Sequence, residues 1–364
     1  MTCSLPGLIQ PGPALRGAGR HRFTLDPRAP AATIDWTVER EEHGRRQTVA
    51  CEHGESLLVE LAGGEERAVV HHLRAACGDV KDSVRIEVFP CGRSSFVFAH
   101  DDAPAVVTHV CVPPTLSSRT GVTVVMHGKL RNAADYLEPW LAWAAEEDQI
   151  ILAPCFDRAS WPGSRSYNLG NVFAGRNGRG ERLPESLWSF TVVEALHEHV
   201  RAGFGLEDEQ FALWGHSAGG QFVHRCLLFK PSARVRTAIA AGCGWFTVPS
   251  THVGFPYGVR HPLLPFEQAD VQDYTAKQLV LMRGTLDTIR DGDLRTTRGA
   301  DAQGANRFDR AAHMLRSAQE ADPHSPWSLV DVPNVGHDAA RMAVAAQEWI
   351  ASELRDARPE RLTA

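Results

Sequence analysis

One short segment constrains the fold of this chain more than any other: a serine flanked by glycines, between an apolar run and a helical pattern. Phe211-Ala-Leu-Trp is typical of a buried strand, Gly215-His-Ser217-Ala-Gly219 follows it directly, and residues 221–229 have helical spacing. Such a sharp turn forces the serine into an unusual backbone conformation and presents its hydroxyl at the carboxyl edge of a sheet. Any Cβ at the two flanking glycines would clash with the neighbouring strand or helix. The segment therefore predicts a nucleophilic serine at a strand-to-helix turn.

The rest of the chain supplies the context that such a turn requires. After Val106, short apolar runs alternate with longer helical patterns, which is typical of a mostly parallel sheet with helices on both faces. The predicted strands cover residues 122–126, 150–154, 211–214, 235–241, 279–282 and 327–332. The predicted helices cover residues 140–147, 188–200 and 221–229, and a last one includes residues 342–349. The pattern favours the α/β class with a doubly wound sheet.

Length and texture divide the chain unevenly. A chain of 364 residues predicts about two domains. We expect residues 1–20 to be a disordered tail and residues 21–105 to be a β-rich accessory region, because strand-like alternation there is separated by turn signals. Residues 106–357 then form the catalytic domain, with a lid-like insertion at about 244–276. Every residue to which we assign chemistry lies in this last part.

An acid and a histidine follow the serine in the chain, each just past its own predicted strand. Asp287 is the preferred acid because it lies nearest to a strand end, and Asp291 and Asp293 are its rivals. His337 follows the last predicted strand and precedes the last helix. The histidine would take the proton of Ser217 on attack and return it to the leaving group, while the acid would hold the imidazole in the right tautomer.

A negatively charged oxygen forms when a serine attacks a carbonyl carbon, and it needs two fixed hydrogen-bond donors. One predicted donor is the backbone N–H of Ala218, directly after the nucleophile. The other is the backbone N–H of Lys129, in the turn His127-Gly128-Lys129 that follows the first conventional strand. We therefore expect these two residues to form the oxyanion hole.

The evidence for substrate contacts is weaker. Aromatic residues are frequent in the two long loops that would border the serine, and they predict a mainly apolar acyl or aromatic pocket. The predicted substrate-binding residues are Trp161, Tyr167, His216, Trp245 and Tyr257. For any one of the aromatics, packing within its own loop is an equally good interpretation. Four arginines near the acid loop (Arg283, Arg290, Arg295 and Arg298) suit a carboxylate, but arginine is frequent throughout the chain.

With these residues in place, the chain resembles the α/β-hydrolase superfamily over about residues 106–354. His127-Gly-Lys-Leu-Arg-Asn-Ala133, Tyr167-Asn-Leu-Gly-Asn171 and Gly215-His-Ser-Ala-Gly-Gly-Gln-Phe222 resemble a bacterial group that is similar to poly(3-hydroxybutyrate) depolymerases and related serine esterases. The resemblance implies ester hydrolysis through an acyl-enzyme, without a cofactor, and it supports Ser217, Asp287 and His337 as the catalytic residues. Secreted polyester depolymerases carry signal peptides and substrate-binding modules, and neither is visible in this sequence.

Composition excludes several other classes. A net charge of −6 argues against nucleic acid as the main partner. The eight cysteines form no C-x-x-C pair, so no metal site is expected. Residues 1–20 contain no apolar core of signal-peptide length, and glycines and prolines interrupt the longest uncharged stretch, residues 237–259. We expect a cytoplasmic protein that acts on a small acyl substrate without inserting into a membrane, and the oligomeric state is left open.

Three functions fit these residues. The preferred one is hydrolysis of a carboxylic ester. The same three residues would also serve a thioesterase, an amidase or an acyltransferase of a biosynthetic pathway, because the triad determines the attacked carbonyl and not the leaving group or acceptor. A non-catalytic binding member of the fold is the least favoured, since the sequence supplies a complete set of catalytic candidates.

Overall fold

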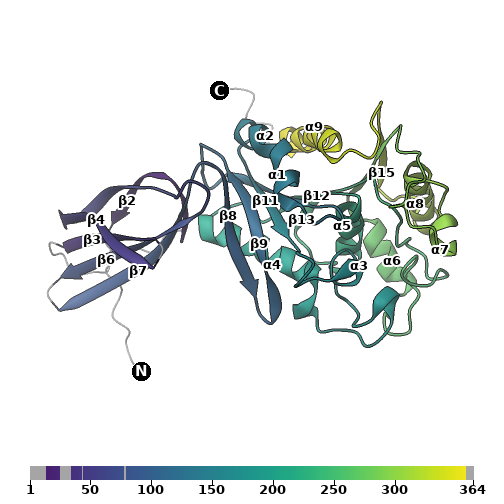
Figure 1. Ribbon diagram of the computed structural model, residues 1–364, viewed down its shortest axis with the longest axis horizontal. Coiled ribbons are helices and arrows are strands. Elements are labelled where there is room, and N and C mark those ends of the chain that lie inside the picture. The colour runs from purple at the N-terminus through teal and green to yellow at the C-terminus, as the bar shows by residue number, and fades with distance from the viewer. Residues whose placement is uncertain (1–13, 25–33, 43, 78, 358–364) are drawn as a thin grey trace.

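The structure, a computed structural model, describes residues 14–24, 34–42, 44–77 and 79–357, and most of the predicted tail lies outside these ranges. The described strands form three sheets, of five, eight and two strands. The strands of the two smaller sheets lie at one end of the molecule, and the eight-stranded sheet with its helices forms the remainder (Figure 1). None of the helices in the described ranges is long and apolar enough to cross a lipid bilayer.

The N-terminal region is built from two packed sheets. Its strands are β1 (Leu15–Gly17), β2 (Gly19–Thr24), β3 (Ile34–Glu42), β4 (Arg45–Gly54), β5 (Ser56–Leu61), β6 (Val69–Cys77) and β7 (Val80–Phe89). The larger sheet has the order β1-β7-β6-β3-β4, and β2 pairs with β5 in the smaller one. Alternate residues of β3 (Ile34, Trp36 and Val38) are buried, because successive side chains of a strand point to opposite faces. They share one apolar core with residues of β2 and β5.

The boundaries of this region differ from the predicted ones. Strand β1 and the start of β2 lie within residues 1–20, where the sequence predicted a disordered tail. At the other end, β8 (Gly92–His100) and β9 (Ala103–Val112) belong to the eight-stranded sheet, so the accessory strands end at Phe89 and not at residue 105. Strands β8 and β9 alternate like the strands before them. They belong to the eight-stranded sheet because β9 pairs with β11 (Gln149–Cys155), and the local sequence pattern carries no information about that pairing.

The eight-stranded sheet confirms the predicted fold class. Its remaining strands are β10 (Gly121–Met126), β11 (Gln149–Cys155), β12 (Phe211–His216), β13 (Val235–Ala241), β14 (Leu279–Gly284) and β15 (Ser328–Val332). The order is β15-β14-β13-β12-β10-β11-β9-β8, and β10 to β15 are mutually parallel. Parallel strands that are buried on both faces read as continuous apolar runs, as β10 and β12 do. Their carboxyl ends meet at one edge, where the loops after β10, β12, β14 and β15 converge.

Helices cover both faces of this sheet. The α-helices are α1 (Ala133–Leu137), α2 (Leu141–Glu146), α3 (Gly163–Ser166), α4 (Ser189–Phe204), α5 (Ala218–Phe229), α6 (Gln268–Thr275), α7 (Arg298–Asp301), α8 (Arg307–Ala321) and α9 (Ala339–Ala357). Three short 3₁₀ helices are η1 (Glu138–Trp140), η2 (Arg176–Gly178) and η3 (Glu185–Leu187). Residues of α4, α5 and α8 share one core with alternate sheet residues, and residues of α1, α2 and α9 share the second core on the opposite face. Helix α9 runs along the same side as α1 and α2 (Figure 1).

The β-rich region is joined to the catalytic domain through aromatic and apolar contacts. Phe89 at the end of β7 lies with its ring 5.4 Å from that of Phe204 and 5.5 Å from that of Phe96. Leu15 of β1 packs against Gly203 of α4, where any larger residue would clash with its side chain. These contacts place the β-rich region beside α4 and β8. The residues proposed for catalysis lie elsewhere, in the loops after β12, β14 and β15.

Candidate active site

Ser217 occupies the turn between β12 and α5 in a strained backbone conformation. Its φ is +59° and its ψ is −114°, which is rare for a residue with a side chain. The flanking glycines make this turn possible. A Cβ at Gly219 would lie 2.0 Å from the Met126 carbonyl oxygen, and one at Gly215 would lie 2.4 Å from the Gly219 backbone. Both contacts are with backbone atoms that cannot move aside, so the turn requires glycine at each position.

The structure brings the predicted acid, histidine and serine into one hydrogen-bonded series. The Ser217 hydroxyl lies 3.1 Å from His337 Nε2, and His337 Nδ1 lies 2.8 Å from Asp287 Oδ2. Asp287 is only 3% exposed, in the turn after β14, whereas His337 lies in the loop between β15 and α9. With Nδ1 protonated, His337 donates to the carboxylate and leaves Nε2 free to accept from Ser217. The arrangement suits proton removal from the serine.

The two rival acids have other partners. Arg307 donates two hydrogen bonds to Asp291, at 2.9 and 3.0 Å, and this contact lowers the pKa of Asp291 to about 2. Arg307 is itself buried and also lies 3.4 Å from Asp287 Oδ1. Asp293 forms an ion pair with Lys129. Among the three carboxylates, Asp287 is the one that contacts the histidine. Sequence reasoning missed Arg307, because the helix that carries it was not predicted.

The predicted oxyanion donors line the same cleft. Lys129 and Ala218 both border a hollow of about 330 Å³ beside the serine. Ala218 is the first residue of α5, so its N–H has no acceptor within the helix. The helix dipole adds partial positive charge at the same end. These positions suit stabilisation of a negatively charged oxygen, and the assignment of the two donors stays a prediction.

Two residues hold the turn that carries Lys129: His127, for which the sequence predicted no role, and Tyr167, which it predicted to bind substrate. His127 donates from Nδ1 to the Gly128 carbonyl at 2.9 Å and accepts at Nε2 from the Phe156 N–H at 3.1 Å. Complete burial lowers the pKa of His127 to about 3, so the ring stays neutral. The Tyr167 hydroxyl donates to the His127 carbonyl at 2.7 Å, and the two rings stack at 4.5 Å. The signal that could have revealed His127 is its position at the end of a buried strand, directly before the turn.

His216 lies directly behind the histidine of the series. Its ring is buried and packs against the His337 ring, with the centroids 4.4 Å apart and the ring planes tilted by 40°. Burial lowers the pKa of His216 well below its usual range, and the nearby His337 lowers it further. A neutral ring here gives His337 a fixed surface to pack on. Burial leaves His216 without access to a substrate, although the sequence predicted a substrate-binding role for it.

Most of the predicted substrate-binding aromatic residues do not line the cleft beside the serine. Among the five predicted substrate-binding residues, Tyr167 lines the cleft beside Ala218. Trp161 is 1% exposed and packs on Phe156, with the ring centroids 5.0 Å apart. Trp245 is buried and packs on Tyr257, with the ring centroids 5.1 Å apart. Beside the apolar groups of Pro162, Tyr167 and Ala218, the cleft is lined by cationic and polar side chains, those of Lys129, Arg131, Arg158, Ser164 and Asn168. The rings of Trp161, Trp245 and Tyr257 pack against their own loops, and the expectation of a mainly apolar pocket at the serine stays a prediction.

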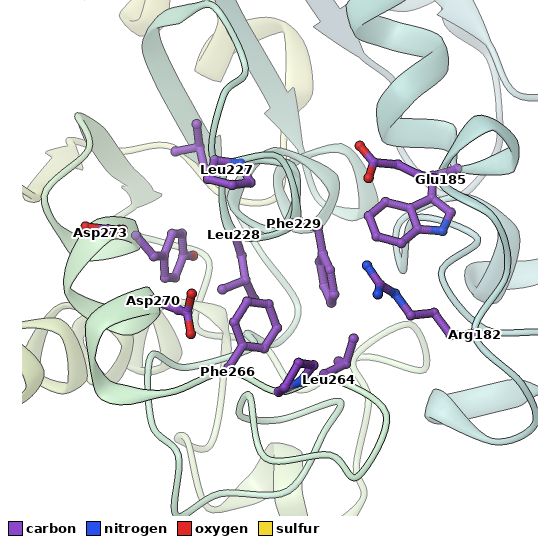
Figure 2. A pocket seen from close by; sticks show the side chains of 13 residues that line it. Arg182, Glu185, Leu227, Leu228, Phe229, Leu264, Phe266, Asp270 and Asp273 are labelled. Atoms are coloured by element: carbon purple, nitrogen blue, oxygen red, sulfur yellow. The ribbon is translucent and has the colours of Figure 1, made fainter.

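An apolar pocket does exist, at the opposite end of α5. Leu228, Phe229, Leu264 and Phe266 point into it, with Arg182 and Asp270 at its rim (Figure 2). Helix α5 has 12 residues and starts directly after Ser217, so the pocket lies about 18 Å from the serine at a rise of about 1.5 Å per residue. The length of α5 separates this pocket from Ser217, so a substrate that reacts at Ser217 does not reach the pocket along the helix.

Comparisons with known proteins identify the family to which this fold belongs. The chain is similar to the solved structure of poly(aspartic acid) hydrolase-1 from Sphingomonas sp. KT-1, with 31% identity and a TM-score of 0.68, over 71% of this chain and 98% of that one. It is equally similar, at 31% identity and a TM-score of 0.65, to LpqC, a poly(3-hydroxybutyrate) depolymerase from Bordetella parapertussis, over 74% of this chain and 91% of that one. No family model matches the chain. A search of curated proteins also found no match.

Proposed function

Because the chain belongs to the α/β-hydrolase superfamily, in its poly(3-hydroxybutyrate) depolymerase-like group, we propose that it is a serine hydrolase that cleaves carboxylic esters through an acyl-enzyme. The observation that carries the proposal is the series of contacts from Asp287 through His337 to Ser217 at a strained strand-to-helix turn. The mechanism requires neither a metal nor an organic cofactor.

The proposed reaction has two halves. Ser217 attacks the ester carbonyl while His337 Nε2 takes the hydroxyl proton, and Asp287 stabilises the imidazolium that forms. The N–H groups of Ala218 and Lys129 stabilise the negatively charged oxygen. His337 then returns the proton to the departing alcohol, which leaves an acyl group on Ser217. A water molecule, activated by the same histidine, releases the acid and restores the serine.

Amide hydrolysis is a second candidate, and one comparison favours it. The similar Sphingomonas protein is a hydrolase of poly(aspartic acid), a polymer joined by amide bonds. The catalytic residues proposed here do not distinguish the two bonds, because the serine attacks the carbonyl carbon of either one. An amide differs from an ester in the protonation that its leaving group needs. Thioester hydrolysis and acyl transfer use the same residues, and no specific observation favours them.

A fluorophosphonate probe tests the serine assignment directly. We expect wild-type protein to be labelled and Ser217→Ala to remain unlabelled, with Ser232→Ala as the control because Ser232 is an exposed serine on a loop away from the site. Rates on matched short-chain ester, thioester and anilide substrates then identify the bond. Unlabelled wild-type protein would contradict a serine hydrolase. A clear preference for the anilide would replace the ester assignment by the amide one.

A further inference from the structure

The cleft beside Ser217 is positively charged in a chain whose net charge is −6. It borders a second hollow, of about 420 Å³, because Pro162, Gly163 and Ser164 line both. Five cationic side chains and no carboxylate line the two hollows: Lys129, Arg131, Arg158, Arg165 and Arg176. The sign of the charge here is therefore opposite to that of the whole chain, and it occurs next to the proposed oxyanion donor Ala218.

Arg131 supplies a fixed positive charge. Its guanidinium donates to three backbone carbonyls of the loop that forms the wall of the cleft, those of Phe156, Trp161 and Gly163, and it stacks on the Tyr167 ring with its central carbon 4.2 Å from the ring centroid. Among the described residues, no carboxylate oxygen lies within 4.0 Å of it. Carbonyl groups hold the guanidinium in place without neutralising it, and the Asp157 carboxylate acts on it electrostatically from beyond ion-pair distance.

Arg158 supplies a positive charge with free donors. It is exposed, and one of its N–H groups donates to the Lys129 carbonyl at 3.1 Å. Within the described part of the chain, that is the only hydrogen bond of its guanidinium, which has five donors. Burial has the largest effect on the pKa of Arg131 and lowers it, and the charge of Arg158 lowers it further, whereas Tyr167, Cys155 and Asp157 raise it. Two like charges held together in this way favour an anion between or beside them.

The other cations are less available to a ligand. Lys129 is already paired with Asp293, and Arg165 donates to Asn171 Oδ1 at 2.6 Å and to the Phe173 carbonyl at 3.1 Å. Arg176 lines the second hollow and not the one that contains Ala218. Arg158, supported by Arg131, is therefore the group best placed to bind an anion near the reacting carbonyl.

The two guanidinium groups of this cleft favour an anionic group over a neutral aliphatic chain. The apolar lining of the cleft includes Pro162, Ala218 and the ring of Tyr167, and the guanidinium groups of Arg131 and Arg158 lie beside them. Covering two guanidinium groups with methyl or methylene groups would remove water from them and return no hydrogen bond, which is unfavourable. A carboxylate accepts two parallel hydrogen bonds from a guanidinium, and such charge-assisted pairs are the strong ones.

We propose that Arg158, with Arg131 behind it, binds a carboxylate carried by the substrate a few bonds from the reacting carbonyl, so that the enzyme prefers anionic esters to neutral ones. This inference rests on the proposed function, because it assigns a substrate class to the same serine. It makes Arg158 a specificity-determining residue of the cleft.

Matched substrates test the proposal. One pair is 4-nitrophenyl hydrogen adipate and its neutral methyl ester, which differ in the charge at the far end of the acyl chain. A second pair places the same difference in the leaving group: the butyrate esters of 4-hydroxybenzoate and of methyl 4-hydroxybenzoate. The readout is the ratio of kcat/KM for the charged over the neutral member of each pair, because this ratio in a variant divided by that in wild type cancels intrinsic reactivity.

We expect wild-type protein to favour the charged member of one pair, and Arg158→Gln to reduce that ratio about tenfold, which corresponds to about 1.4 kcal/mol. Arg158→Lys should retain part of the preference and Arg158→Glu should reverse it. Arg316→Gln, which removes an exposed arginine from α8, should leave the ratio unchanged. Raising the salt concentration to about 1 M should weaken the preference, since the Debye length falls to about 3 Å.

The outcomes separate this inference from the function on which it rests. If the fluorophosphonate probe labels Ser217 and the ratios in Arg158→Gln equal those in wild type for both pairs, the anion site is wrong and the hydrolase assignment stands. If wild-type protein is neither labelled nor active on any of the four esters, the proposed function fails and the inference fails with it.

Discussion

At the scale of single residues, three histidines lie close to Ser217 or to its proposed oxyanion turn, and their surroundings give each a different chemistry. His337 is partly exposed and lies between a hydroxyl and a carboxylate. His216 and His127 are buried, and burial lowers the pKa of each, so both rings remain neutral at ordinary pH. A proton taken from Ser217 therefore has one acceptor, and the other two rings support His337 and the turn of Lys129.

Replacement of the acid should separate Asp287 from its rivals. In Asp287→Asn the amide can no longer hold the correct tautomer of His337, so we expect kcat/KM to fall by about 10³–10⁴-fold with an intact fold. Asp291→Asn should lose far less activity, because Asp291 contacts Arg307 and not the histidine. Esterase kinetics with thermal melting of each variant check this. Retained activity in Asp287→Asn, with loss in Asp291→Asn or Asp293→Asn, would identify the wrong acid.

Tyr167 should influence catalysis through the backbone of the proposed oxyanion turn. In Tyr167→Phe the buried His127 carbonyl loses its hydrogen bond from the hydroxyl, and such a loss costs about 1–3 kcal/mol. If the turn becomes less ordered, stabilisation of the oxyanion weakens, and we expect kcat to fall about tenfold or more with a smaller change in KM.

The control for that experiment is Tyr274→Phe. Tyr274 is a buried tyrosine whose hydroxyl has no hydrogen-bond partner among the described residues, and it lines the distant apolar pocket. The Tyr274→Phe substitution removes the same atom without touching the turn, so the kcat of this variant should match that of wild type. A higher KM with an unchanged kcat in Tyr167→Phe would assign Tyr167 to substrate binding and not to positioning.

At the scale of elements, the strand-to-helix turn connects local strain with tight packing. Helix α5 lies against β10 and β13 because its first turn consists of small residues. A Cβ at Gly220 would lie 2.7 Å from the Ala241 carbonyl oxygen, just as one at Gly219 would collide with Met126. The same close approach brings the N-terminus of the helix to the sheet edge, where the loop that carries Lys129 begins. Catalytic geometry and packing therefore depend on the same glycines.

Enlarging one of these glycines should damage both properties. We expect Gly219→Ala to lower the free energy of unfolding by about 1–3 kcal/mol or more and to abolish esterase activity, because the new methyl group meets backbone atoms of β10. Gly292→Ala is the matched control, since a Cβ there has no atom within 4 Å and the backbone φ is not positive. Urea denaturation of both variants provides the measurement. A Gly219→Ala protein as stable and active as Gly292→Ala would contradict the close packing described here.

Elements with a strong local pattern were the predictable ones. The parallel strands were found within one or two residues, because buried strands read as continuous apolar runs, and helices α4, α5 and α9 have clear apolar faces. Helix α8 was missed. Four of its fifteen residues are arginine or histidine at positions that include the buried Arg307 and Arg310, so its inner face is only partly apolar. A charged residue that is buried through partners far away in the sequence leaves no periodic signal.

The site was predictable in part for the same reason. The positions of Ser217, Asp287 and His337 follow from the ends of strands, and the structure places these three side chains together. The character of the cleft was not predictable. Trp161 and Trp245 are buried in their loops, whereas Tyr167, Arg131 and Arg158 border the cleft. Side-chain direction in an irregular loop depends on contacts such as those of Arg131 with three distant carbonyls.

At the scale of the whole molecule, burial of neutral histidines couples folding to pH. His127, His197, His216 and His224 are all buried in the catalytic domain, and burial lowers the pKa of each. In the unfolded chain a histidine titrates near its ordinary pKa of about 6.5. Between that value and the lower pKa of the folded protein, the unfolded chain binds more protons, so the free energy of unfolding decreases as the pH falls.

His197 gives the cleanest test, because it lies away from the proposed catalytic residues. Its ring stacks on Phe211 at 4.4 Å, and burial lowers its pKa to about 4, with smaller opposing effects from Glu198 and Arg201. The stability that this residue contributes is fully present above pH 6.5 and is lost as the pH falls towards 4, by up to about 3 kcal/mol. The His197→Phe variant keeps an aromatic ring in the stack and removes the titration.

We expect urea denaturation of wild-type protein at pH 7.5, 6.5, 5.5 and 4.5 to show a free energy of unfolding that decreases steadily below pH 6.5. In His197→Phe that decrease should be smaller by about 1 kcal/mol per pH unit between pH 6 and 4. His199→Phe makes the same change at an exposed position of the same helix and should follow the wild-type curve. A His197→Phe protein with the full wild-type pH dependence would mean that His197 binds its proton in the folded state as readily as in the unfolded chain. Acid sensitivity would then have to come from other groups.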